Sequence, residues 1–214
     1  IKIENGKAVT NPLKCMLCGK CVKACPSSIR DILGHEHEIR PLVKELLKDQ
    51  MFYEESGGGV TLSGGEVMGV DPEYVLALAK ELHRQGIDIT VDTCGEAPYE
   101  RFKAMLPYVS TFLYDVKSMD PEIHKKYVGA DNARILDNLC RLSADGARIY
   151  IRIPMIKEVN ATEKNIRATI DFLHKNNIHV AQVNLLPYHN TGCSKYPRIG
   201  MTYDCLLYTS DAAD

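Results

Sequence analysis

The residues with the clearest chemical potential are four closely spaced cysteines. Cys15, Cys18, Cys21 and Cys25 lie within the string CMLCGKCVKACP, while the other four cysteines are scattered along the chain. Three thiolates follow one another at Cys-x-x-Cys spacing, and the fourth comes after three intervening residues and precedes Pro26. Bacterial iron–sulfur proteins bind [4Fe–4S] clusters with such a run. The cysteines therefore predict an iron–sulfur cluster near the start of the chain.

Two other uses of these thiols fit the spacing less well. Disulfides between such near neighbours would close small, strained loops, and the chain has the character of a protein from a reducing compartment. Zinc sites usually combine two Cys-x-x-Cys units across a longer spacer.

The number of clusters stays open at this point. In two-cluster ferredoxins the fourth cysteine of the run ligates the other cluster. On that pattern Cys25 needs partners that precede Ile1, and we expect the chain to begin within a longer protein. The alternative is a single cluster that all four thiolates bind.

A second set of chemically capable residues follows the predicted strands. In parallel α/β folds ligands bind at the carboxyl ends of the strands, so residues at these positions are candidates for binding. The set consists of Gly64, Gly65, Glu66, Asp92, Thr93, Asp115, Lys117, Arg152 and His189.

Together these residues suit a zwitterionic ligand with a nucleoside. The two glycines let backbone carbonyls approach an ammonium group, and Lys117 and Arg152 suit a carboxylate. Asp92 and Asp115 suit a ribose or a small cation, and His189 suits an adenosine.

Each residue also has a purely structural interpretation. The glycines can form a tight turn, the two cations can be solvated or paired with nearby acids, and a lone histidine is commonly structural. Cys94, Cys140 and Cys193 are interpreted as packing or incidental thiols. Only the joint pattern favours a binding site.

Strands and helices alternate along the chain, which predicts an α/β fold with a parallel sheet and right-handed crossovers. Apolar spacing and Asp-Pro-Glu start signals predict helices over 38–50, 71–86, 98–106, from 120, around 135–146 and from 162. Five strands are predicted over 60–63, 87–92, 111–116, 148–153 and 179–186.

The overall composition narrows the class of partner. The chain has 214 residues and a formal net charge of −2, with no run of basic residues. This argues against nucleic acid or an anionic membrane as a partner. No apolar run approaches the roughly 20 residues that span a bilayer, and no signal peptide opens the chain, so we expect a cytoplasmic protein. Residues 205–214 have no periodicity, and we expect them to be a non-native, adapter-derived tail.

Five strings taken together resemble the glycyl-radical enzyme activating enzymes of the radical SAM superfamily, from about Ile1 to Gly200. They are SGGGVTLSGGEVM, VDTCGEAPYE, FLYDVKSMDPEIHKKYVGADN, RIPMIKEVN and LLPYHNTGCSKY. The resemblance implies a partial (β/α)6 barrel, with the five strands as its second to sixth. It assigns residues 1–34 to half of a ferredoxin-like insert and 35–204 to the barrel.

The resemblance also implies roles for the candidate residues. Gly64, Gly65 and Glu66 would contact the methionyl amine of S-adenosylmethionine, and Lys117 and Arg152 its carboxylate. Asp92, Thr93 and Asp115 match positions near the ribose and a monovalent cation, and His189 matches a ligand-contacting position.

The implied activity is reductive cleavage of S-adenosylmethionine to a 5′-deoxyadenosyl radical, which abstracts hydrogen from a glycine of a partner glycyl radical enzyme. A flavodoxin or ferredoxin-like donor would supply the electron. However, the Cys-x-x-x-Cys-x-x-Cys signature of the catalytic cluster is absent from this sequence. We therefore expect this chain by itself to be inactive. The alternatives are a different radical SAM reaction, or a ferredoxin-type electron carrier with an α/β binding domain.

Overall fold

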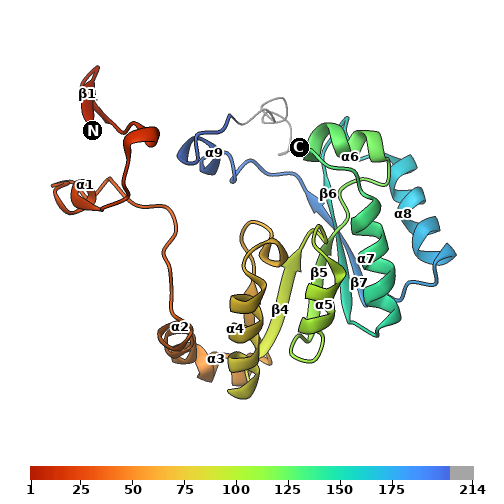
Figure 1. Ribbon diagram of the computed structural model, residues 1–214. Helices are drawn as coiled ribbons and strands as arrows, with labels where there is room; N and C mark the ends of the chain where they lie inside the picture. The colour runs from red at the N-terminus through yellow and green to blue at the C-terminus, as the bar shows by residue number, and fades with distance from the viewer. Residues whose placement is uncertain (203–214) are drawn as a thin grey trace.

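A single parallel sheet organises the computed structural model, which describes residues 1–202 (Figure 1). Its five strands lie in chain order and each neighbouring pair is parallel. They are β3 (Gly59–Leu62), β4 (Asp88–Thr93), β5 (Thr111–Asp115), β6 (Ile149–Met155) and β7 (Gln182–Pro187). All five carboxyl ends therefore share one edge of the sheet, as the sequence predicts.

Helices alternate with these strands (Figure 1). They are α4 (Pro72–Arg84), α5 (Tyr99–Met105), α6 (Pro121–Val128), α7 (Ala133–Ala144) and α8 (Glu163–Lys175). The helices α4, α5, α7 and α8 contribute side chains to the core on one face of the sheet, whereas α6 contributes none. The two Asp-Pro-Glu signals act as predicted: the Asp71 and Asp120 carboxylates accept backbone N–H bonds at the first turns of α4 and α6.

The core lies between the helices and this face of the sheet. Alternate strand residues are fully buried there, and they pack against the apolar faces of α4, α5 and α7. Those on the strands are Ile89, Val91, Phe112, Tyr114, Ile149, Ile151 and Ile153. The intervening residues point to the other face, and Asp92, Asp115 and Arg152 are half-buried there. Strand alternation thus separates an apolar core from a polar face.

The segment before β3 differs from the single helix predicted over 38–50. It forms α2 (Ile39–Leu46), a 3-10 turn η2 (Leu47–Asp49) and α3 (Gln50–Ser56). Both Leu47 and Tyr53 pack on the core, although they are six residues apart and would diverge on a regular helix. The tighter 3-10 turn between them brings Tyr53 back towards the core face.

Residues 1–34 lie apart from the sheet (Figure 1). They contain an antiparallel hairpin, β1 (Lys2–Glu4) and β2 (Lys7–Val9), followed by a 3-10 turn η1 (Pro12–Lys14) and the short helix α1 (Lys20–Lys23). No residue before Val43 is buried. The hairpin is not anticipated by the sequence analysis.

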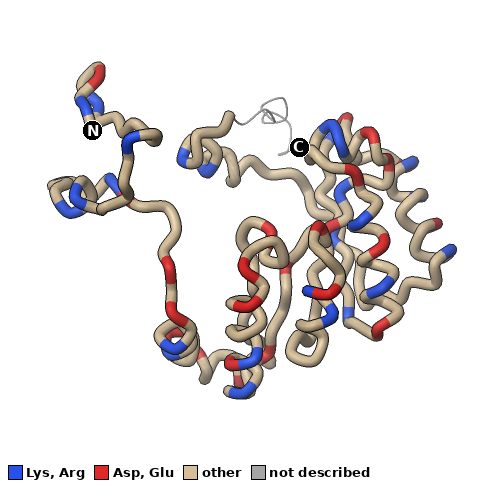
Figure 2. The backbone as a smooth tube through the Cα atoms, in the orientation of Figure 1, with Lys and Arg blue, Asp and Glu red and all other residues tan. Residues whose placement is uncertain are grey.

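Between β7 and residue 202 the chain forms a short helix, α9 (Lys195–Arg198). The expected adapter-derived tail, 205–214, lies outside the described residues. Within 1–202 no helix combines the length and the apolarity needed to cross a bilayer. Positive and negative side chains are interspersed over helices α4 to α8 (Figure 2).

Candidate functional site

Three predicted site residues meet at the carboxyl edge of the sheet, which we call the rim. Arg152 on β6 donates from Nε to Asp115 Oδ1 on β5 at 2.8 Å, and its Nη2 also bonds Asp92 on β4. The three side chains lie on the same face of the sheet. Asp115 is paired with Arg152 in the register of β5 and β6, and Asp92 is paired with Leu113, two residues before Asp115 on β5. Ser63 Oγ donates to the second oxygen of Asp92 at 3.1 Å.

This group of three residues has more negative than positive charge, because the Arg152 guanidinium is the partner of two carboxylates. Burial raises the pKa of Asp115 above its usual value, and the neighbouring Arg152 opposes that shift. All three side chains are only about one-fifth exposed, at 20%, 24% and 18% for Arg152, Asp92 and Asp115. Arg152 therefore already has two anionic partners, which its Nε and Nη2 groups contact; its predicted ligand role stays a prediction.

Lys117 lies two residues beyond Asp115 and is half-buried. Within the part of the chain that the structure describes, its ammonium group forms no ion pair. Its backbone is fixed, because Asn160 Nδ2 donates to the Lys117 carbonyl at 2.5 Å and to the Pro154 carbonyl at 2.6 Å. Lys117 thus has no close anionic partner there, and at longer range its charge opposes the rise in the pKa of Asp115 and of Cys94.

The glycine turn after β3 has open space beside it. Gly64 has a φ of +140°, which favours glycine, and a Cβ added at Gly64 or Gly65 would meet no atom within 4 Å. The backbone of this turn is accordingly free to approach a ligand. Glu66, the next residue, directs its carboxylate into the protein, where it accepts from Thr93 Oγ1 at 2.6 Å and from the Cys94 backbone N–H at 2.7 Å.

Two buried asparagines that the sequence analysis missed hold the rim loops. Asn138 on α7 donates to the carbonyls of Gly95 and Ala97, both at 2.8 Å, and so fixes the loop after β4. Asn160 joins the loops after β5 and β6, and its Oδ1 accepts from the Ile156 N–H at 2.7 Å. A signal exists for Asn138, since it interrupts the apolar face of α7 next to Ile135 and Leu139.

His189 follows β7 and is exposed. Its Nδ1 lies 2.6 Å from Thr191 Oγ1, a contact within its own loop. The structure places it beyond the carboxyl end of β7 without a hydrogen bond or ion pair to the other rim residues within 1–202. Its contact with an adenosine stays a prediction.

The cysteine run lies in the separate N-terminal segment. Cys15 and Cys18 are exposed, and Cys21 and Cys25 are half-buried. The structure does not gather them: over residues 1–202, no group of three or more histidine, cysteine or acidic side chains is arranged to hold a metal ion. The donors nevertheless suit a cluster at Cys25, because backbone N–H groups, above all that of Ile29, lower the pKa of its thiol and favour the ligating thiolate.

Comparison with known proteins agrees with the parallel α/β architecture. Residues 18–184 match the Radical SAM superfamily. The trans-4-hydroxy-L-proline dehydratase activating enzyme of Clostridioides difficile is 44% identical over 91% of this chain and 74% of its own length. The choline trimethylamine-lyase activating enzyme of Oleidesulfovibrio alaskensis is 37% identical over 83% of this chain and 58% of its own length.

A solved structure gives the same result for the fold. A domain of pyruvate-formate lyase-activating enzyme from Bacteroides vulgatus is 40% identical, with a TM-score of 0.59, over 63% of this chain and 83% of that chain. The present chain thus spans between 58% and 74% of the length of the two activating enzymes named above.

Proposed function

Because this chain belongs to the radical SAM superfamily, among the glycyl-radical enzyme activating enzymes, we propose that its protein uses S-adenosylmethionine to install a glycyl radical on a partner enzyme. The five strands are then the second to sixth of a partial (β/α)6 barrel. The observation that carries the proposal is the rim, where an accessible glycine turn, an unpaired lysine and two aspartates share one edge of the sheet.

Different rim residues would contact different groups of S-adenosylmethionine. The Gly64–Gly65 backbone would meet the methionyl ammonium group, within the turn that Glu66 completes. Lys117, which forms no close ion pair in the described chain, would meet the carboxylate, and Arg152 would join it through the guanidinium donors that its two aspartates do not use. Asp92, Thr93 and Asp115 would lie near the ribose and a monovalent cation, and His189 near the adenine.

The cofactors would supply the radical chemistry: with a reduced [4Fe–4S] cluster bound, one electron would cleave S-adenosylmethionine to methionine and a 5′-deoxyadenosyl radical, which would remove a hydrogen atom from a glycine and leave as 5′-deoxyadenosine. The present chain supplies binding and orientation. Its cysteines do not fit the catalytic cluster, since no Cys-x-x-x-Cys-x-x-Cys occurs in the sequence. No catalytic residue is therefore assigned to this chain.

Residues 1–34 would form part of a ferredoxin-like insert beside a barrel domain that begins at 35. In this proposal Cys15, Cys18, Cys21 and Cys25 bind auxiliary [4Fe–4S] clusters, and a flavodoxin or ferredoxin-like protein in the cytoplasm donates electrons. The backbone N–H groups around Cys25 Sγ support the assignment, because such hydrogen bonds stabilise a ligating thiolate and tune cluster potential.

The test is anaerobic reconstitution of a protein that contains this chain together with a catalytic-cluster signature. With reductant and S-adenosylmethionine it should form 5′-deoxyadenosine, and a co-purified glycyl radical enzyme should acquire a radical visible by electron paramagnetic resonance. The present chain, treated identically, should form no 5′-deoxyadenosine. Absence of 5′-deoxyadenosine from the longer protein would reject the proposed function.

A further inference from the structure

Three donors from its own protein bond the Glu66 carboxylate. Oε1 accepts from Thr93 Oγ1 at 2.6 Å and from the Met68 backbone N–H at 3.0 Å, and Oε2 accepts from the Cys94 backbone N–H at 2.7 Å. The carboxylate forms no ion pair within residues 1–202. Hydrogen bonds to a charged acceptor are stronger than neutral ones, so this group has a substantial structural effect.

The bonds join two loops from different strands. Met68 belongs to the 3-10 turn η3 (Val67–Gly69) that follows β3, whereas Thr93 and Cys94 end β4 and begin its loop. The loop after β3 begins with the Gly64–Gly65 turn, and Asp92 precedes Thr93 on β4. Glu66 therefore sets the separation between two parts of the proposed binding site.

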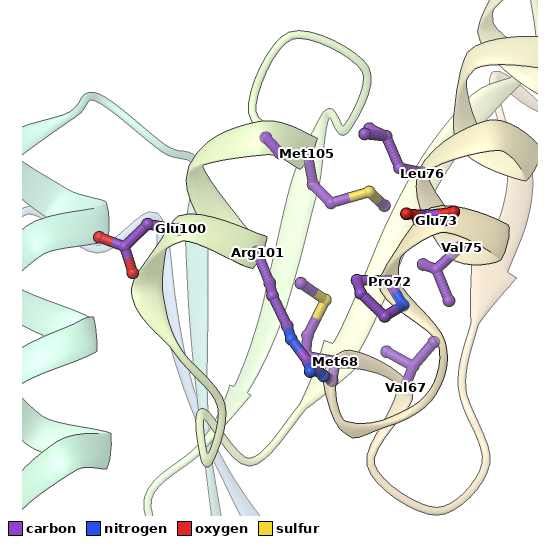
Figure 3. Close-up of a pocket in the computed structure, with 10 residues that line it drawn as sticks. Val67, Met68, Pro72, Glu73, Val75, Leu76, Glu100, Arg101 and Met105 are labelled. Carbon is purple, nitrogen blue, oxygen red and sulfur yellow. The ribbon is translucent and has the colours of Figure 1, made fainter.

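Each loop is also anchored independently of Glu66. On the β3 side, Arg101 extends from α5 and donates to the Met68 carbonyl at 2.7 Å (Figure 3). On the β4 side, the Gly95 N–H donates to Thr93 Oγ1 at 3.0 Å, and Asn138 bonds the carbonyl of Gly95. Because each loop has its own anchor, Glu66 links two fixed parts rather than folding either one.

We propose that Glu66 is a positioning residue whose carboxylate links the loops after β3 and β4, and so holds the Gly64–Gly65 backbone at the distance from β4 that the ligand requires. The proposal rests on the proposed function for the identity of that ligand, S-adenosylmethionine. It assigns Glu66 a role that does not depend on contact with the methionyl amine, because three donors within the protein already bond its carboxylate.

Hydrogen exchange of the unliganded full chain tests the link itself. Glu66→Gln keeps one acceptor oxygen, and the orientation that retains the two bonds from Thr93 Oγ1 and the Met68 N–H places the NH2 group opposite the Cys94 N–H, from which it cannot accept. The Cys94 amide should then exchange about tenfold faster or more, as expected when a bond to a charged acceptor is lost. Glu55→Gln, at an exposed glutamate on α3, is the matched control and should leave exchange of this amide unchanged.

A second pair of variants removes the partner instead. Thr93→Val deletes the hydroxyl that donates to Glu66 and accepts from the Gly95 N–H, so the readout is Met68 on the other loop, which Thr93 meets through the Glu66 carboxylate. Exchange at Met68 should accelerate in Thr93→Val and return to slow exchange in Thr93→Ser, which retains a hydroxyl. This pair decides the question even when Glu66→Gln does not fold. Unchanged exchange at Cys94 in Glu66→Gln, or at Met68 in Thr93→Val, would overturn the proposal.

Binding of labelled S-adenosylmethionine to the full chain, measured by equilibrium dialysis, tests the consequence for the ligand. Glu66→Gln should raise Kd by about tenfold, in parallel with the faster exchange, and Glu55→Gln should not. Weaker binding with unchanged exchange would indicate direct contact and overturn the positioning role, as would faster exchange with unchanged Kd. Failure of the unmodified chain to bind S-adenosylmethionine would count against the proposed function alone, and the exchange results would still decide whether the link exists.

Discussion

Among the single residues of the rim, two carboxylates contact one arginine. Arg152 bonds both Asp92 and Asp115, and the group is mostly withdrawn from water. Removing one partner from such a group is costly, because the remaining charges stay buried without compensation. The same arrangement can bind ligands of either charge. A cationic ligand can replace the Arg152 guanidinium beside the two aspartates, and an anionic ligand can bind the guanidinium itself.

Arg152→Gln should therefore lower the free energy of unfolding by about 2–3 kcal/mol near neutral pH. The loss should shrink towards pH 4. Asp115 has a raised pKa in the folded protein, so the folded state binds this proton more tightly than the unfolded state, and its stability falls as pH rises above the usual carboxyl value of 3.8. Without Arg152 the free energy of unfolding falls more steeply with rising pH. Urea unfolding of both proteins at pH 4 and near neutral pH measures this difference.

Arg167→Gln is the control for this prediction. Arg167 pairs with Glu163 one turn away on α8, and both side chains are exposed. Such pairs contribute about 0.3–0.5 kcal/mol, so this variant should change stability little at either pH. An equal loss in Arg152→Gln at both pH values would contradict the assignment of charge in the rim.

At the scale of elements, the loop after β4 is packed against β5 and α7. Gly95 is buried with a φ of +79°, and a Cβ added there would lie 1.9 Å from the hydroxyl oxygen of Tyr114. That hydroxyl donates to the Ile135 carbonyl at 2.7 Å, which fixes the tyrosine in turn. The loop thus takes its position from a buried tyrosine on the next strand and from α7.

Gly95→Ala should cost about 2–4 kcal/mol of unfolding free energy, since the variant combines a left-handed backbone with a clash against a fixed side chain. Gly146→Ala provides a close comparison: Gly146 has a φ of +80°, but no atom lies within 4 Å of the added Cβ. It should cost only about 1 kcal/mol, the backbone contribution. Equal losses in the two variants would show that Tyr114 yields to the methyl group.

At the scale of the whole molecule, the barrel part and residues 1–34 are structurally unequal. Every buried apolar residue lies at Val43 or later within the described chain, and the contacts of residues 1–34 with the rest include an exposed pair between Asp31 and Arg198 at 3.8 Å. The sheet and its helices therefore provide the stability. The N-terminal segment provides the cysteines.

Deletion of residues 1–34 should leave the unfolding free energy within about 1 kcal/mol of the full chain, because exposed pairs contribute little. The same deletion should abolish iron–sulfur binding on anaerobic reconstitution, measured as iron content and cluster absorbance. Val43→Ala, which removes buried atoms from the core, should cost about 1–3 kcal/mol and shows that the assay detects a loss. A large loss of stability on deletion would show that the segment packs more closely than the structure indicates.

The amino-acid sequence alone predicts the order of strands and helices, because apolar periodicity, Asp-Pro-Glu caps and terminal glycines act within short stretches of chain. It also placed Asp92, Asp115, Lys117 and Arg152 near the ends of strands. Together with the cysteine spacing and the family resemblance, this was enough to predict an α/β fold of the radical SAM type, which the comparisons confirm. The predicted ligand roles of these residues and the iron–sulfur cluster stay predictions.

Only the tertiary structure decided which groups are partners. Arg152 bonds Asp92 from 60 residues away, and Glu66 meets Cys94 from 28 residues away. Asn138 and Asn160 reach loop carbonyls that no local pattern connects with them. Such pairings depend on the register of parallel strands and on how α7 packs, and these are set by long-range contacts. For that reason the sequence indicated which residues lie at the rim but not which of them remain free for a ligand.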